Sequence, residues 1–154
     1  MQSHAQSHHG HHGGGGSLRV SAQATLHCLT GCVIGEVAGL MIGVSLGLAV
    51  WQTIVLATAL AYASGMTLGL VPVMRSRGIG MIAALRIIWL GEVISIGVME
   101  LAMNFADYQM GGMAAPSVLS WMFWRGIAVA VPAGFLAAWP VNWWLLRRNL
   151  KSCH

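Results

Sequence analysis

The chain has 154 residues, of which 56% are hydrophobic and only 8% are charged, and its mean hydropathy is +0.70. A water-soluble domain carries about a quarter charged residues, so this composition excludes an ordinary soluble protein and indicates a protein of the lipid bilayer. The formal net charge of +4 is not accompanied by a basic cluster with interleaved aromatic residues, so no nucleic-acid partner is expected.

Residues 1–17, MQSHAQSHHGHHGGGGS, form a low-complexity segment that ends in a run of glycines. Such a segment has no apolar side chains to bury, so we expect a disordered, His-rich cytoplasmic tail. An expression tag with a linker is the alternative. Because tags usually use an unbroken run of histidines, a native tail that collects metal ions is favoured.

Four apolar stretches follow, and each has the roughly 20 residues that a membrane crossing requires. They predict transmembrane helices at about 24–46, 51–73, 80–103 and 118–142. The fold class is therefore all-α, an integral membrane bundle of four transmembrane helices over residues 18–149, with a cytoplasmic tail at 150–154. Pro132 is expected to kink the fourth helix, whereas Pro72 and Pro140 are expected to end theirs.

Basic residues indicate the orientation of the bundle. With four crossings, the N-terminus, the 74–79 loop and the C-terminus lie on one side, which carries Arg19, Arg75, Arg77, Arg147, Arg148 and Lys151. The opposite loops carry no Lys or Arg, and their one charged residue is Asp107. Since positive residues remain cytoplasmic, both termini should be cytoplasmic, in a multi-pass protein of the inner (plasma) membrane.

Small residues recur every four positions in the first two predicted helices, at Gly31, Gly35, Gly39, Gly43 and Gly47 and at Ala57, Ala61, Gly65 and Gly69. Residues four apart lie on one face of a helix, and small faces let helices in lipid approach closely. The two helices should form a tight antiparallel hairpin. This pattern predicts packing and no chemistry.

The segment HCLTGCVIGE, residues 27–36, contains the residue types that bind soft metals. Thiolate and imidazole ligands favour copper(I) or zinc, which makes His27, Cys28, Cys32 and Glu36 candidate ligands. In the alternative interpretation, the cysteines are small packing residues and His27 lies at the membrane interface. Three cysteines, with Cys153 in the C-terminal tail, do not indicate a disulfide framework.

Glu36 and Glu92 lie near the middle of their predicted helices, where an ionisable group is costly and indicates function. Both should face the bundle interior, where they share a proton, coordinate a cation, or serve only as a polar clasp between helices.

From Glu92, a helical stripe continues through Met99, Glu100 and Met103, and its thioethers and carboxylates could line a path for a soft cation. Packing is the alternative for the methionines. Glu100 is expected to pair with Arg125.

Four segments together, HCLTGCVIGE, GMTLGLVPVMR, ISIGVMELAMN and WPVNWWLL, make the chain resemble a family of small integral membrane proteins, domain of unknown function 4396. The resemblance covers about residues 24–149, and its HCxxGCxxGE motif is specific. The positions that match are His27, Cys28, Gly31, Cys32, Gly35, Glu36, Pro72, Arg75, Ser95, Glu100 and Asn104. The family often has aspartate where this chain has Glu92, and an acidic residue where this chain has Met103. Some relatives are joined to copper-oxidase-like domains, which implies copper by analogy.

The leading hypothesis is a non-enzymatic membrane protein that binds a soft transition metal, with transport of that metal as its extension and with copper favoured over zinc. A second hypothesis is a non-catalytic scaffold or subunit of a larger membrane complex, and a homo-oligomer is expected in either case. A third is a membrane thiol-redox protein that uses Cys28 and Cys32. No hydrolase or nucleotide-binding motif is found in the sequence.

Overall fold

The structure is a computed structural model in which residues 15–148 are described, with side chains from residue 18. It contains helices α1 (Gly15–Ser45), α2 (Val50–Arg77), α3 (Met81–Met110) and α4 (Trp121–Arg147), with a short 3-10 helix, η1 (Gly112–Ala114), before α4. No strand occurs among these residues, so the all-α prediction is confirmed. The predicted disorder of the tail concerns residues that lie mostly outside this range, although α1 already begins at Gly15.

All four long helices are long and apolar enough to cross a membrane, so this is an integral membrane protein. The helices extend past the predicted spans, and α2 and α4 continue through Pro72 and Pro140. The expectation that these prolines end helices is wrong. A proline removes only one backbone donor, and within a membrane bundle neighbouring groups can satisfy the carbonyl that it frees.

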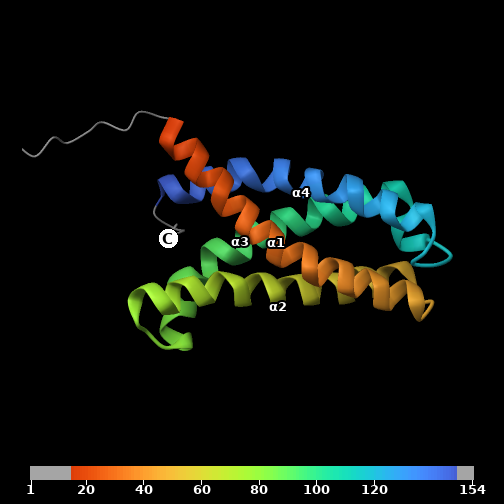
Figure 1. Ribbon diagram of the computed structural model, residues 1–154, viewed down its shortest axis with the longest axis horizontal. Coiled ribbons are helices and arrows are strands. Elements are labelled where there is room, and N and C mark those ends of the chain that lie inside the picture. The colour runs from red at the N-terminus through yellow and green to blue at the C-terminus, as the bar shows by residue number, and fades with distance from the viewer. Residues whose placement is uncertain (1–14, 149–154) are drawn as a thin grey trace, which may run out of the picture.

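The helices run alternately up and down, as Figure 1 shows. The start of α1, the turn between α2 and α3 and the end of α4 lie at one end of the bundle, here called the terminal end. The α1–α2 turn and the segment between α3 and α4 lie at the opposite, or loop, end. α1 crosses the bundle obliquely, so that it packs mainly along α2 and also contacts α4, while α3 packs mainly along α4.

The bundle exposes apolar side chains and buries small and polar ones. Large exposed side chains include Leu26, Ile34, Val55, Leu101 and Leu136. In water this distribution would be unfavourable, but a bilayer solvates such side chains as well as a protein core does. It therefore supports the conclusion that these faces contact lipid.

Turns form where the backbone needs a positive φ. Gly47 (φ 63°) follows α1, Gly78 (φ 61°) ends α2 and Gly111 (φ 75°) ends α3. Glycine adopts this conformation without a steric penalty. Gly47 therefore belongs to the turn, and not to the glycine face of α1 as its spacing predicted.

The other glycines of α1 contact α2 directly, which confirms the tight antiparallel hairpin. A Cβ atom at Gly31 would lie 2.9 Å from the Cα atom of Gly65, and one at Gly39 would overlap the backbone of Ala57. A Cβ atom at Gly43 would overlap Thr53 in the same way. The backbones of α1 and α2 are thus close enough that no side chain fits between them.

We predict that Gly39→Ala destabilises the protein despite the higher helix propensity of alanine. The added methyl group must displace α2, and such overpacking costs about 1–3 kcal/mol. Thermal unfolding in detergent, followed by the loss of monodisperse protein, should show a lower midpoint. The matched control is Gly80→Ala, because a Cβ atom there meets nothing within 4 Å. Equal midpoints for the two variants would contradict the close approach of α1 and α2.

Candidate functional site

The acidic side chains define the interior of the bundle. The chain has four acidic residues, and Glu36, Glu92, Glu100 and Asp107 are all buried, with at most 7% of any side chain exposed. Every arginine between residues 18 and 148 is exposed. The interior that these residues line therefore contains carboxyl groups and no arginine.

α3 supplies most of this lining because its polar and soft residues recur with the helical period. Glu92, Ser95, Met99, Glu100, Met103 and Asp107 are all buried on one face of the helix. The stripe from Glu92 to Met103 was predicted from the sequence, and the structure extends it to Asp107. Asp107 had been assigned to a loop, and its position seven residues after Glu100 was the signal for its place on this face.

At the level of Glu92, α1 brings its two cysteines against α3. The Cys28 thiol donates a hydrogen bond to Glu92 Oε2 at 3.7 Å, and its sulfur lies 3.9 Å from Ser95 Oγ. Cys32, one turn further along α1, interacts with Cys28. It also lies close enough to Glu92 and Glu100 for electrostatic interaction with both carboxyl groups. Neither cysteine forms a disulfide bond, and both are buried. We call Cys28, Cys32, Glu92 and Ser95 the thiol cluster.

Two methionines extend this cluster toward the loop end. Met99 and Met103 are buried in the same group of packed side chains as Cys28 and Cys32. They lie against α4 at Gly134, where a Cβ atom would be 2.9 Å from Met103 Sδ and 3.2 Å from Met99 Cγ. The interior thus holds two thiols and two thioethers.

Glycines on α2 make room for the thiol cluster. A Cβ atom at Gly65 would lie 3.1 Å from Cys32 Sγ, and one at Gly69 would lie 3.4 Å from Glu92 Cδ. The small-residue pattern was predicted to serve packing alone. At these two positions it also accommodates the side chains of the candidate site.

A second polar group lies closer to the loop end. The carboxyl groups of Glu36 on α1 and Glu100 on α3 interact with each other. Asn104 Nδ2 donates to the Glu100 carbonyl at 2.8 Å and to Thr58 Oγ1 of α2 at 3.2 Å, and lies 3.5 Å from Glu100 Oε2. We call Glu36, Glu100 and Asn104 the carboxyl cluster.

Several oxygen atoms of this region have no hydrogen bond of ordinary geometry within the described part of the chain. They are both carboxyl oxygens of Glu36, Oε1 of Glu100, Oδ1 of Asn104 and both carboxyl oxygens of Asp107. Buried polar groups are nearly always hydrogen-bonded. These oxygens are therefore free to accept hydrogen bonds from groups that lie outside the described residues.

Two further hydrogen bonds join α1 to α4 at the terminal end. Asn142 Nδ2 donates to Thr25 Oγ1 at 2.8 Å, and Trp139 Nε1 donates to Ser21 Oγ at 3.1 Å. These residues were not recognised from the sequence. The signal was available, because Ser21 and Thr25 precede Cys28 and Cys32 on the same face of the helix.

Some sequence-based expectations are not met by the arrangement. His27 is exposed and lies 3.2 Å from the Leu68 carbonyl oxygen, so its ring is bound to α2 and not to the thiols. Arg125 is exposed and donates to the Met110 carbonyl oxygen at 2.7 Å. Its predicted pairing with Glu100 is wrong, because Glu100 is turned inward.

Glu36 and Glu92 are both in the interior but belong to different clusters. Glu92 lies beside Cys28, and Glu36 follows Cys28 by eight residues, a rise of about 12 Å along the helix. Glu36 interacts instead with Glu100. The structure thus joins Glu36 to Glu100 rather than to Glu92.

Within residues 15–148, no group of three or more His, Cys, Asp and Glu side chains is arranged to hold a metal ion. A tetrahedral zinc site, which needs four such ligands, is therefore not preformed there. The two thiols with neighbouring thioethers are a different set, of the kind that softer ions prefer.

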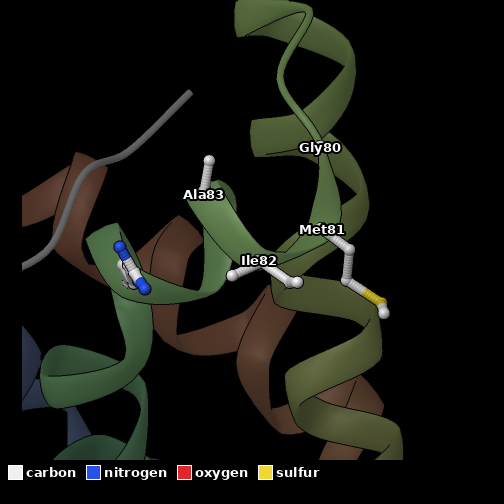
Figure 2. Close-up of a pocket in the computed structure, with 5 residues that line it drawn as sticks. Gly80, Met81, Ile82 and Ala83 are labelled. Atoms are coloured by element: carbon white, nitrogen blue, oxygen red, sulfur yellow. The ribbon is translucent and has the colours of Figure 1, made fainter.

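An open pocket lies elsewhere, at the start of α3, where Gly80, Met81, Ile82, Ala83 and Arg86 line it, as Figure 2 shows. Its lining residues are mostly apolar and exposed. None of them belongs to the thiol cluster or the carboxyl cluster, so we do not assign this pocket to the candidate site.

Comparisons with known proteins agree with the resemblance seen in the sequence. Neither a curated protein nor a solved structure matches the chain. The family model described as "Domain of unknown function (DUF4396)" matches residues 18–151, which include both clusters and all four helices except the first three residues of α1. The chain belongs to the DUF4396 family.

Proposed function

We propose that this protein binds a soft transition-metal ion, copper(I) first, inside its membrane bundle and moves it across the bilayer. The observation that carries the proposal is the separation of charge: all four acidic residues are buried and every described arginine is exposed. An interior of this kind favours a cation, because isolated negative charge in a membrane is costly. The plasma membrane and a cytoplasmic position of the termini remain part of this proposal.

The sulfur atoms favour copper(I) over other cations. Soft thiolate and thioether ligands select copper(I), and Cys28, Cys32, Met99 and Met103 share one buried group. A zinc ion would require a fuller set of His, Cys, Asp or Glu ligands than the described residues bring together.

Glu92 supplies the proton acceptor that metal binding requires. Cysteine binds a metal as the thiolate, so binding releases protons. The Cys28 thiol already donates to Glu92 Oε2, which gives its proton a place to go inside the bundle. Glu92 becomes neutral as it takes this proton, and the Cys28 thiolate carries the negative charge that compensates the bound ion.

The residues suggest an order along a path. The His-rich tail and exposed His27 would collect ions at the terminal end, Cys28 and Cys32 would receive them, and Met99, Met103 and Glu100 would pass them toward the loop end. Glu36, which is buried at 1% exposure, adds a further carboxyl group beside this path. Four helices leave little room for a closed path within one copy of the protein. A homo-oligomer, or a complex with other membrane proteins, would supply the rest of its walls.

The scaffold hypothesis is favoured by one specific observation, the close packing of α1 on α2 through Gly31, Gly35, Gly39 and Gly43. This packing needs no ligand to explain it. It does not account for a buried thiol beside a buried carboxyl group. For the thiol-redox hypothesis, the structure shows Cys28 and Cys32 buried and without a disulfide bond between them.

We predict that Cys28→Ser/Cys32→Ser abolishes tight copper(I) binding, because serine hydroxyl groups are hard ligands. The measurement is copper bound per protein under competition with a copper(I) chelator, with the tail histidines replaced by alanine in every variant. The matched control is Cys153→Ser, which changes the remaining cysteine and should retain binding. Equal copper binding by the double variant and the control would rule out the thiol cluster as the site.

We further predict that Glu92→Gln weakens copper(I) binding by roughly 10–100-fold, the usual cost of removing a group that supports a metal ligand. Ser95→Ala is the control, because Ser95 Oγ lies at a similar distance from Cys28 Sγ but carries no charge. It should change the affinity less than about threefold. If the two variants bind copper equally well, Glu92 has no role as proton acceptor.

A further inference from the structure

We propose that the terminal end of the bundle carries a binding site for one anionic phospholipid, between the first turn of α1 and the last turns of α4. An acyl chain of the lipid lies in an apolar groove there, and Arg147 holds its phosphate. This site is separate from the thiol cluster, and the inference does not depend on metal binding.

The groove itself is the first reason. Its volume is about 240 Å³, and it is lined by Leu18 of α1 and by Trp139, Pro140 and Trp143 of α4. Each of these side chains presents an apolar surface. Pockets that enclose a whole small molecule usually measure about 300–1,000 Å³. The groove therefore fits a segment of an acyl chain whose remainder stays in the bilayer.

Contacts within the protein hold the walls of the groove in place. Trp139 Nε1 donates to Ser21 Oγ of α1 at 3.1 Å, and the Trp139 ring packs on Phe135 with ring centroids 5.6 Å apart. Asn142 Nδ2 donates to Thr25 Oγ1 at 2.8 Å. Because α1 crosses the bundle obliquely (Figure 1), these bonds fix the crossing beside the groove. A preformed groove lowers the cost of ordering the site when a lipid binds.

The groove lies at the edge of the membrane-spanning part of the chain. Leu18 lies at the start, and Arg147 at the end, of helical segments that are long and apolar enough to cross a membrane. Lipid headgroups lie at this depth, where tryptophan is enriched because its ring is apolar and its N–H group is polar. A lipid whose acyl chain enters the groove therefore has its phosphate near Arg147.

Arg147 provides a positive charge at the mouth of the groove. Its Cζ atom lies 3.9 Å from the centroid of the Trp143 ring, which lines the groove. An arginine that stacks on an aromatic ring keeps N–H groups at its edge available, and these can donate to two oxygens of one phosphate. Arg19, which follows Leu18, is also exposed and adds positive charge on the α1 side.

Charge complementarity selects an anionic occupant. The chain has four acidic residues, all of them within residues 15–148, and all are buried. Their side chains therefore do not compete with a lipid phosphate for exposed Arg147. A zwitterionic phospholipid carries the same phosphate but adds a cationic group, which Arg147 and Arg19 repel. Anionic lipids are also abundant in the cytoplasmic leaflet, where the proposed orientation places the terminal end.

The test is native mass spectrometry of the full-length protein in detergent, titrated with dioleoyl phosphatidylglycerol or with dioleoyl phosphatidylcholine. The wild type should bind one phosphatidylglycerol molecule at least about tenfold more tightly than phosphatidylcholine, since two arginines flank the groove. Arg147→Gln should weaken phosphatidylglycerol binding by about fivefold, the usual contribution of one arginine near an anionic lipid surface.

Arg148→Gln is the matched control. Arg148 is also exposed at the end of α4 and also lies over a tryptophan ring, with its Cζ atom 5.5 Å from the centroid of Trp144. Trp144 does not line the groove. The control variant loses the same charge, and its affinity for phosphatidylglycerol should change by less than about twofold.

Leu18→Trp tests the groove without changing any charge. Because 47% of the Leu18 side chain is exposed, a larger ring can be accommodated there without repacking the interior, and it should fill the space for the acyl chain. We expect it to weaken phosphatidylglycerol binding as strongly as Arg147→Gln does.

The wild-type comparison decides the question even if a variant does not fold, since equal binding of the two lipids would overturn the proposal. Equal effects of Arg147→Gln and Arg148→Gln would show attraction to the basic surface as a whole and would overturn it too. So would unchanged binding by Leu18→Trp, which would place the lipid outside the groove. A wild-type dimer that Leu18→Trp dissociates would make a second copy of the chain the occupant, which also contradicts the proposal.

Discussion

A bilayer cannot solvate a charged side chain, and this constraint governs how the helices of this protein meet. Every acidic residue of the chain is placed inside the bundle, where water is scarce and where the described residues provide no arginine. Such an arrangement is costly unless protons or other cations neutralise part of the charge. The cation binding that we propose would offset part of this cost.

Glycine is what makes this interior possible. On α1, glycines bring the backbone into contact with α2 and pull the two helices together. On α2 and α4, glycines instead leave space for larger side chains that project from α1 and α3. These glycines are Gly65, Gly69, Gly126 and Gly134. One residue type therefore sets both the closest approach of the helices and the room for the polar groups.

The two clusters divide the interior along its axis. Nearer the terminal end, soft sulfur atoms lie beside one carboxyl group, a combination suited to a soft metal ion. Nearer the loop end, the carboxyl groups of Glu36 and Glu100 are buried together on α1 and α3.

The sequence alone determined the membrane setting, the four crossings, the α1–α2 hairpin and the stripe of α3, because hydrophobicity and helical period are local properties that neighbouring residues express directly. It also indicated that Cys28, Cys32, Glu36 and Glu92 belong in the interior. Only the tertiary structure decided which helix each of them faces: Glu92 meets Cys28, Glu36 meets Glu100, and His27 turns away to α2. The reason is that the oblique crossing of α1 sets these partners, and a crossing angle depends on how side chains of different helices fit together.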